Sequence, residues 1–434
     1  LQGLLVDELD PLLGLMDDGL SLSTALPVVL GADGNGRKSY LILVQNEDEL
    51  RPTGGFITTV GKLVLQNGRI ISLDFEGVDD REDWTRPYPA APWQLQEYMN
   101  ADVLILRDSN WYADFPASAR WAEYLYSYDH PGPLDGVIAF DQQFLVMLLG
   151  VLGPLEVEGA PYPITSGNVI EYMRSAKSPP AGEPVPPDWY RKTFIEDIAG
   201  AILRELVGGG NKDWRGLAAT LVRTLDERHL LMQFDDQAIA SLLAEQDWDN
   251  AVRPFDGDFL MTTDSNIGYN KTNALVDISL SYDVDLTDLS APKGTLVLNH
   301  KNNSSRDVPC IHWGYRQEDD IKWYPMDRCY WNYLRVYKQT GVELTPVVVN
   351  RHAPLPVMVS HIEGVRSCPA TARDHTSRPF ALIIAVDVMR YRYLRTRYRR
   401  HRHLPFRPLH PQPTHPHPHP WMGGWCAAEP RPGW

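Results

Sequence analysis

The feature that most constrains the fold is a series of short apolar runs between residues 38 and 210, separated by segments of helical spacing. The runs are Ser39 to Gln45, Phe56 to Leu65, Arg69 to Phe75, Val103 to Leu106 and Gly136 to Phe140. Short, nearly all-apolar runs are typical of strands buried on both faces, and Gln66-Asn67-Gly68 predicts a tight hairpin. Strands that alternate with helices predict an α/β domain, with a central mixed sheet covered by helices on both faces.

Changes of pattern divide the chain into five parts. These are an N-terminal helix and linker (1–37), the α/β domain (38–210), a helical segment (211–260), a small β-sandwich-like domain (261–343) and a tail (344–434). The chain starts at Leu1 inside an amphipathic helical pattern, so we expect its true start to lie upstream. No apolar run reaches the roughly 18 residues of a membrane span, so an anchor is expected only in that upstream segment.

The net charge of −15 is distributed unevenly along the chain. Residues 1–343 carry 52 acidic and 28 basic side chains, whereas residues 344–434 carry 13 Arg, no Lys and 4 acidic side chains. An acidic body repels the nucleic acid backbone, so we expect no nucleic acid partner.

The tail has an unusual composition. It holds 9 of the 13 His, and eight Pro or His residues lie in the ten positions from Pro411 to Pro420. This composition, together with the loss of strand-like pattern after Glu343, favours a shifted reading frame. A disordered native tail, a basic arm and a His-rich metal site are the alternatives. We expect the tail to be extended and detached from the body.

Polar side chains follow several of the predicted strands and lie on two later helices. They are Asn46, Glu47, Glu49, Arg51, Arg107, Asp108, Asn110, Asp141, Arg174 and the pair Arg191-Lys192. Ligands of open α/β sheets gather at the carboxyl ends of strands. Arginine clamps phosphate oxygens while carboxylates hold Mg²⁺ against them, so the pattern suits a phosphate or pyrophosphate with a divalent cation. A purely structural ion pair between Arg107 and Asp108 is the alternative.

The body has few histidines. His130 and His229 stand apart from other candidate ligands in the sequence. The pattern therefore gives little support to a His-based triad or a zinc site.

Five segments carry a recognisable order of motifs. They are Gln45 to Phe56, Leu106 to Pro116, Leu134 to Asp141, Leu152 to Pro154 and Cys329 to Tyr337. Together they closely resemble the bacterial family called domain of unknown function 4012, over about residues 20 to 340. Members of that family look like envelope proteins with an N-terminal membrane anchor. The resemblance therefore implies an extracytoplasmic protein, membrane-associated through a segment upstream of residue 1, and implies no activity.

Three further segments follow one another in the order Leu106-Arg107-Asp108, Glu171-Tyr-Met-Arg-Ser175 and Asp188-Trp-Tyr-Arg191. They are similar to motifs of the LytR-CpsA-Psr phosphotransferases, which attach glycopolymers from polyprenyl-pyrophosphate carriers to the bacterial wall. This resemblance implies catalytic Arg107 and Asp108. It also implies pyrophosphate ligands Arg51, Arg174, Arg191 and Lys192, with Mg²⁺ on Glu47, Glu49 and Asp108. Asn46 and Pro52-Thr53 stand where those enzymes carry a carboxylate, which leaves fewer metal ligands.

Two functions follow as hypotheses. The first is an envelope protein that binds or transfers polyprenyl-pyrophosphate-linked glycopolymer. The second is a non-catalytic module that binds an envelope glycan or a protein, with Trp84, Trp93 and Trp111 as contact residues. Convergence of the candidate arginines in one cleft would favour the first hypothesis, and scattered arginines would favour the second.

All four cysteines follow residue 309. Cys310 and Cys329 flank predicted β segments in a chain that we expect to lie outside the cytoplasm, where disulfides persist. A disulfide between them is therefore expected, and two free buried thiols are the alternative.

Overall fold

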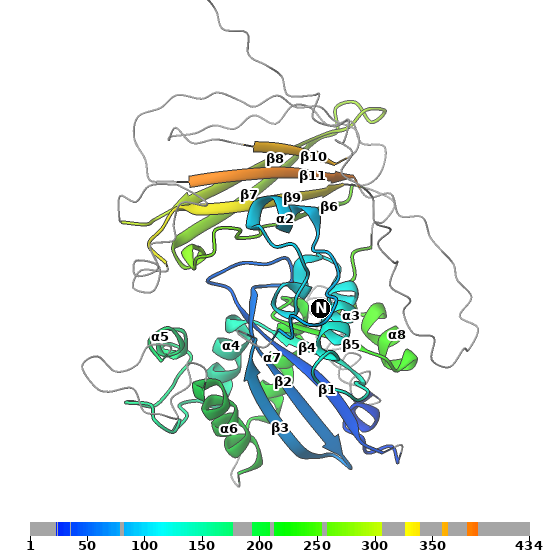
Figure 1. Cartoon of the computed structure of the whole chain (residues 1–434), viewed down its shortest axis with the longest axis vertical. Coiled ribbons are helices and arrows are strands. Elements are labelled where there is room, and N and C mark those ends of the chain that lie inside the picture. The colour runs from blue at the N-terminus through cyan, green and yellow to red at the C-terminus, as the bar shows by residue number, and fades with distance from the viewer. Residues whose placement is uncertain are drawn as a thin grey trace, which may run out of the picture.

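The computed structural model of the chain describes residues 23, 25–34, 36–78, 82–176, 193–208, 212–253, 258–305, 326–338, 358–362 and 380–388. These residues form an α/β part and a β part that lie next to each other, the β part at the top of Figure 1.

A five-stranded mixed sheet forms the centre of the α/β part. Its strands are β1 (Lys38–Asn46), β2 (Phe56–Gln66), β3 (Arg69–Gly77), β4 (Gly136–Phe140) and β5 (Leu230–Phe234), in the order β3-β2-β1-β4-β5. Only β1 and β4 are parallel, and the other neighbours are antiparallel. Asn67 and Gly68 join β2 to β3 with φ of 51° and 73°, as the predicted hairpin requires.

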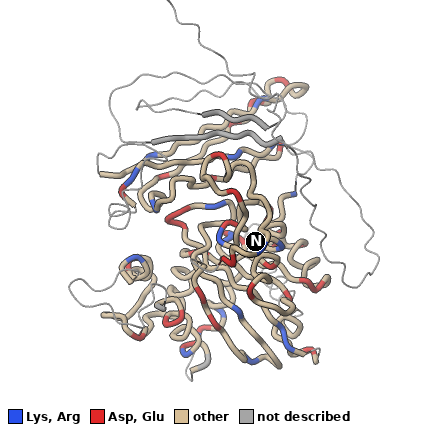
Figure 2. Tube along the Cα trace, viewed as in Figure 1, with Lys and Arg blue, Asp and Glu red and all other residues tan. Residues whose placement is uncertain are grey.

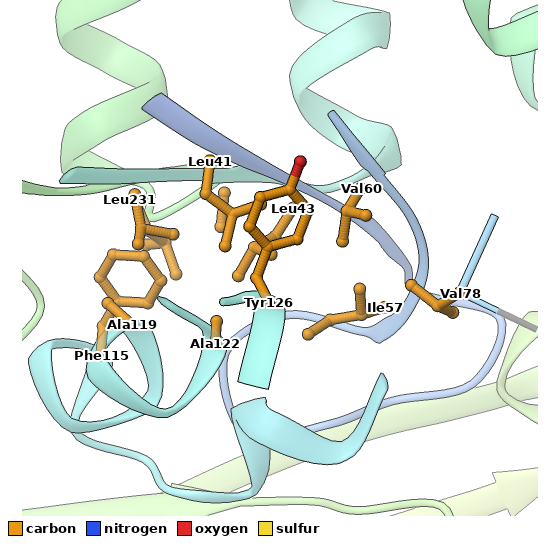
Figure 3. Close-up of a cluster of buried hydrophobic side chains, with 12 residues drawn as sticks. Leu41, Leu43, Ile57, Val60, Val78, Phe115, Ala119, Ala122, Tyr126 and Leu231 are labelled. Carbon is orange, nitrogen blue, oxygen red and sulfur yellow. The ribbon is translucent and has the colours of Figure 1, made fainter. Parts of the chain in front are cut away.

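Helices cover both faces of this sheet, as predicted. The helices of the α/β part are α3 (Phe115–Tyr126), α4 (Gln142–Leu152), α5 (Val169–Ser175), α6 (Thr193–Val207), α7 (Trp214–Asp226) and α8 (Gln237–Glu245). A further helix, α2 (Trp93–Met99), packs instead against Trp111 and the β part. On one face, Phe115 and Ala119 of α3 pack on Leu41 and Leu43 of β1 (Figure 3). On the other face, α7 and α8 bury side chains against Tyr40.

Two sequence predictions inside this part were wrong. Val103 to Leu106 is not a sheet strand: Val103 makes one isolated bridge to Ala90, and a 3-10 helix η1 (Leu106–Trp111) follows. Leu104 is buried by packing with α2 and Trp111, so this apolar run needs no sheet partner. Residues 211–260 are also not wholly helical, because β5 lies among them and pairs with β4, which extends the α/β domain beyond residue 210.

The β part contains two sheets. One has the order β10-β11-β9-β6, formed by β6 (Leu260–Thr263), β9 (Tyr330–Lys338), β10 (Met358–Ile362) and β11 (Phe380–Val388). The other is the hairpin of β7 (Val276–Asp285) and β8 (Lys293–Asn302), preceded by a 3-10 helix η2 (Thr272–Leu275). The expectation of a detached tail is corrected for residues 358–362 and 380–388, because β11 pairs in parallel with β9 and β10 through backbone hydrogen bonds. The rest of residues 344–434 lies outside the described residues.

Two further expectations concern the N-terminal helix and a membrane-spanning segment. The predicted helix within residues 1–20 lies outside the described residues. Among the described helices, none has the length and apolar character that a membrane crossing requires.

Glu123 of α3 offers a test of the packing beside the sheet. Its Oε1 is buried with no hydrogen-bond partner within the described part of the chain, and burial together with Asp235 raises the pKa of Glu123 to about 7. The folded state therefore holds this proton more tightly than the unfolded state, so stability falls as pH rises from about 4.5 through 7. We expect Glu123→Gln to raise the free energy of unfolding by about 1–3 kcal/mol at pH 8 and to change it little at pH 5.

Urea unfolding at both pH values measures this difference. Glu97→Gln, at an exposed position of α2, is the matched control and should show no such pH dependence. Equal changes for Glu123→Gln at pH 5 and pH 8 would contradict the prediction.

Candidate functional site

The site lies where β1 and β4 end. These two strands are parallel neighbours, with Val44 opposite Phe140, so their carboxyl ends open at the same edge of the sheet. The loop of residues 47–55 leaves β1 there, and Asp141 follows β4 directly. The loop begins with acidic residues and continues to Arg51, seen as red and then blue on the tube in Figure 2. Charged side chains from distant parts of the chain are therefore gathered at this edge.

Three of these residues form what we call the carboxylate–histidine cluster: Glu47, Asp141 and His229. One potential ligand atom of each lies within 4.8 Å of the others. His229 Nδ1 is 2.7 Å from Asp141 Oδ2. Because β5 runs antiparallel to β4, its start lies beside the end of β4, which places His229 next to Asp141.

The first turn of α4 holds both carboxylates of the cluster in place. Asp141 is the N-cap of α4 and accepts a hydrogen bond of 3.0 Å from the amide of Phe144. Glu47 accepts one of 2.9 Å from the amide of Gln143. Free amides at a helix N-terminus favour negative side chains, so the helix offsets part of the repulsion between the two acids.

The cluster shifts the proton affinity of two of its members. Burial, and then the charge of Asp141, raises the pKa of Glu47 to about 7. The hydrogen bond to Asp141 raises the pKa of His229 above its usual value. Both groups therefore bind a proton more tightly than they would in the unfolded chain, and a bound cation would displace these protons.

Beside the cluster, Arg174 of α5 pairs with Asp48. The contacts are Nε to Oδ2 at 3.1 Å and Nη2 to Oδ1 at 2.5 Å, a two-pronged geometry. The side chain of Arg174 is 34% exposed, whereas that of Asp48 is 2% exposed. Arg174 therefore keeps part of its side chain accessible to a ligand in solution.

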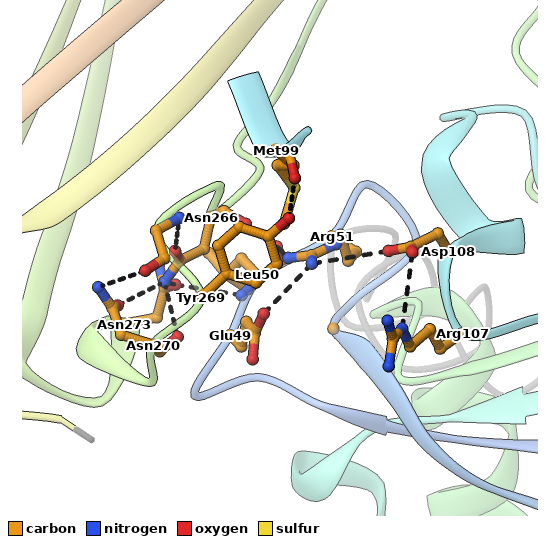
Figure 4. A network of polar contacts seen from close by, with 12 residues as sticks. Glu49, Leu50, Arg51, Met99, Arg107, Asp108, Asn266, Tyr269, Asn270 and Asn273 are labelled. Carbon is orange, nitrogen blue, oxygen red and sulfur yellow. Dashed lines mark hydrogen bonds and ion pairs between the residues drawn. The ribbon is translucent and has the colours of Figure 1, made fainter. Parts of the chain in front are cut away.

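A second group, the arginine network, comprises Glu49, Arg51, Arg107 and Asp108 (Figure 4). Arg51 Nη2 is 3.2 Å from Glu49 Oε1 and 3.8 Å from Asp108 Oδ1. Arg107 Nε is 3.9 Å from Asp108 Oδ2. Burial raises the pKa of Asp108, although both arginines act in the opposite direction.

The arginine network joins the two parts of the molecule. Arg51 Nη1 donates a hydrogen bond of 2.6 Å to the carbonyl of Asn266, and the amide of Leu50 donates one of 3.1 Å to Asn273 Oδ1. Tyr269 lies beside Arg51 in Figure 4. Only 1% of the Arg51 side chain is exposed, so in this conformation it supports the interface and does not reach solvent.

Asn110 holds the loop of residues 47–55 against η1. Its buried amide nitrogen lies within 2.9 Å of Gln45 Oε1, Thr53 Oγ1 and the carbonyl of Gly55. A Cβ on Gly55 would lie 2.4 Å from the backbone carbon of Asn46, so the loop can close on itself only with glycine there. Contacts within the protein therefore fix the conformation of the loop of residues 47–55.

The structure therefore separates the residues that the sequence grouped. Arg51, Arg107, Glu49 and Asp108 meet in one network, but Glu47 lies in the carboxylate–histidine cluster and Arg174 pairs with Asp48. The predicted metal set of Glu47, Glu49 and Asp108 is corrected, because Arg51 occupies the space between the last two. Arg191 and Lys192 lie outside the described residues. The arginines do not all face one cleft, because Arg51 points inward.

Two residues of this site escaped the sequence prediction. His229 was set aside as isolated, and Asp48 was not considered. One feature of the sequence could have pointed to His229. It directly precedes the apolar run from Leu230 to Phe234, so it stands at the start of a strand. Among the predicted contact aromatics, Trp84 and Trp93 are exposed but Trp111 is 2% exposed and packs with Tyr333, so Trp111 is a core residue.

The carboxylate–histidine cluster fits a divalent cation. Two carboxylates and one imidazole are a donor set that a protein can offer to a single ion. Mg²⁺ prefers oxygen ligands alone, whereas Mn²⁺ accepts an imidazole nitrogen beside carboxylates and Zn²⁺ favours imidazole. The donor set therefore favours Mn²⁺ or Zn²⁺ over the Mg²⁺ that the sequence resemblance implied.

Cys329 is disulfide-bonded. Cys310 lies outside the described residues, so the pairing of these two cysteines stays a prediction.

A comparison with family models gives a match over about one third of the chain. Residues 35–177 match a family model described as "Protein of unknown function (DUF4012)", which confirms the resemblance seen in the motifs over that range. No curated protein matches the chain.

Several solved structures are similar to about half of the chain. Lin1025 from Listeria innocua is 11% identical with a TM-score of 0.30, covering 49% of this chain and 79% of that one. TagV from B. subtilis is 9% identical with a TM-score of 0.28 (52% and 87% covered), and TagU from B. subtilis is 9% identical with a TM-score of 0.26 (51% and 100% covered).

Proposed function

We propose that this chain is a cell-envelope protein whose α/β domain binds the phosphate-bearing end of a lipid-linked glycopolymer outside the membrane. One observation carries the proposal. Glu47, Asp141 and His229 present ligand atoms within 4.8 Å of one another at the carboxyl ends of two adjacent parallel strands. This is the edge of an α/β sheet at which ligands usually bind.

Charge explains why the ligand would be a phosphate. A divalent cation on the cluster would neutralise the two carboxylates and offer positive charge to phosphate oxygens. Arg174 lies next to the cluster: its hydrogen bond to Asp48, and after it the charges of Asp48 and Glu47, raise the pKa of Arg174. Its partly exposed side chain suits a second phosphate oxygen.

The substrate class comes from the sequence. The ordered motifs around Arg107, Arg174 and Arg191 are similar to enzymes that take glycopolymers from polyprenyl-pyrophosphate carriers. An extracytoplasmic location follows from the same resemblance and is part of the proposal. Pyrophosphate, a sugar chain and a polyprenyl tail are then the three parts of the ligand.

Binding without transfer is the version that the geometry favours. Asp108, the predicted catalytic carboxylate, is 8% exposed and lies between Arg51 and Arg107. Its oxygens are thus engaged in holding the loop to η1. Arg107 has a side chain that is 37% exposed and remains available to a ligand.

The direct test is binding of a short-chain polyprenyl pyrophosphate to the full chain in detergent. We expect binding that requires Mn²⁺ or Zn²⁺, is lost with a chelator, and weakens about tenfold in Arg174→Gln. Arg37→Gln, an exposed arginine before the opposite end of β1, is the matched control and should bind as the parent does.

Two results would decide against parts of the proposal. Equal binding with and without a divalent cation, or no binding at all, would overturn the phosphate site. Release of inorganic phosphate or transfer of the sugar to an acceptor would show that the chain is a transferase and overturn the binding-only version.

A further inference from the structure

Six aromatic side chains form a continuous series of ring contacts on the α/β part. Successive ring centroids lie 5.9, 5.0, 5.3, 5.9 and 6.5 Å apart. We call this the aromatic surface, and in order its members are Trp84, Tyr88, Tyr128, Tyr124, Trp121 and Tyr112. It connects the loop after β3 with α3.

One end of the aromatic surface is open to solvent. Trp84 is 68% exposed, which is unusual for the largest apolar side chain. Tyr88, its neighbour, is half-buried and rests on Tyr128, whose hydroxyl oxygen is 2.9 Å from that of Tyr124. The inner rings thus fix the position of the outer ones, and Trp84 is presented on a rigid base.

A small pocket opens beside Tyr88. Its volume is about 30 Å³, and its apolar lining includes Val60, Val78, Leu106 and Leu125. This is more than the roughly 10–15 Å³ that one water needs and too little for a sugar ring. The pocket therefore has room for a small apolar substituent such as the methyl of an acetyl group.

Polar side chains line the same pocket. They are Glu76, Glu82, Asp129 and His130. His130 Nε2 is 3.0 Å from Glu76 Oε1, and the ring stacks on Tyr126 with centroids 4.1 Å apart. His130 Nδ1 is buried and has no hydrogen-bond partner among the described residues. Carboxylates at these positions accept hydrogen bonds from hydroxyl and amide donors of a ligand.

The charge of this region selects among ligands. Three carboxylates line the pocket, and Asp83 lies next to Trp84, while Arg86 pairs with Asp83. The excess of negative charge repels phosphate and uronate groups. A neutral sugar does not meet this repulsion, and its apolar ring face packs well on an indole or phenol ring.

We propose that the aromatic surface and its pocket bind an N-acetylated neutral sugar of a glycan, separately from the phosphate site. The sugar ring would lie on Trp84 and Tyr88, the acetyl methyl would enter the pocket, and the acetamido N–H would donate to one of the carboxylates. This goes beyond the proposed function, because it assigns a second site and its chemical class. None of the pocket residues belongs to the carboxylate–histidine cluster or the arginine network.

The test compares two glycans of equal length and linkage. Chitotetraose carries acetamido groups and cellotetraose does not. Both are titrated into the full chain in the presence of a chelator, so that failure of the metal-dependent phosphate site cannot affect the result. We expect chitotetraose to bind at least about tenfold more tightly than cellotetraose. Equal affinities, or no binding of chitotetraose, would overturn the proposal.

Variants then locate the site. Trp84→Ala is expected to weaken chitotetraose binding about tenfold, whereas Trp214→Ala, which removes a similarly exposed tryptophan (60%) from α7, should have no effect. Val78→Ile adds one methylene to the pocket wall and should reduce the preference for chitotetraose without unfolding the protein. Unchanged binding in Trp84→Ala, or an unchanged preference in Val78→Ile, would contradict this placement of the sugar.

Discussion

Arg51→Met is expected to lower the free energy of unfolding by about 3–5 kcal/mol, the cost of removing one partner from a buried ion pair. Arg51 is 2% exposed and faces both Glu49 and Asp108, which are 8% exposed each. The variant leaves two buried carboxylates without their main cation. It also removes the hydrogen bond to the carbonyl of Asn266, which connects the α/β part to the β part.

Urea unfolding at pH 7, followed by tryptophan fluorescence, measures this loss. Arg223→Met is the matched control, because Arg223 pairs with Glu227 on the exposed surface of α7 and should change stability by less than about 1 kcal/mol. A second variant, Arg51→Met with Asp108→Asn, should recover part of the loss, since one uncompensated charge is gone. An Arg51→Met protein as stable as the parent would show that Arg51 is not structural and would reopen its role as a phosphate ligand.

His229→Ala is expected to weaken Mn²⁺ binding by about 100-fold or more. Loss of a residue that only supports a metal ligand costs about 10–100-fold, and loss of a ligand itself costs at least as much. Glu47→Gln should have a similar effect, because an amide is a poorer ligand than a carboxylate. Isothermal titration with Mn²⁺ at pH 7.5 measures both, at a pH where Glu47, with its pKa of about 7, is mostly ionised.

Glu49→Gln distinguishes two candidate metal sites: the carboxylate–histidine cluster and the set that was predicted from the sequence. Glu49 was a predicted metal ligand, but its Oε1 lies 3.2 Å from Arg51 Nη2. Glu49→Gln should therefore bind Mn²⁺ as the parent does. If Glu49→Gln lost the metal while His229→Ala kept it, the carboxylate–histidine cluster would not be the cation site.

Most of the central sheet could be predicted from local pattern. The runs that became β1 and β4 are nearly continuous apolar segments, and Asn67-Gly68 marks the turn of the hairpin between the β-rich runs that became β2 and β3. The carboxyl ends of β1 and β4 were therefore identifiable as the edge that carries charge. The family resemblance located the same segments, between residues 35 and 177.

The elements that local pattern missed owe their structure to distant partners. The residues of β5, Leu230 to Phe234, include Leu, Met and Gln, which also suit helices. They form a strand because β4 offers a free edge and because α7 and α8 bury Leu230 and Phe234. Val103 to Leu106 is the opposite case: its apolar sequence resembled a strand, but it forms none in the sheet. Packing against α2 buries its apolar side chains instead.

For the candidate site, too, the sequence predicted one part and the tertiary structure decided another. Residue types near strand ends were enough to predict an edge that combines carboxylates with arginines, because those positions follow directly from the strand pattern. Which acid meets which partner was decided by contacts across long sequence separations. His229 reaches Asp141 over 88 residues through antiparallel pairing, and Arg174 reaches Asp48 over 126 residues through the packing of α5. Tertiary structure also decided which candidate residues are buried. Arg51 and Trp111 carry side chains that suit ligand contacts, but residues of the β part pack against both of them. The sequence does not show this burial, because the β part meets these residues only in the folded chain.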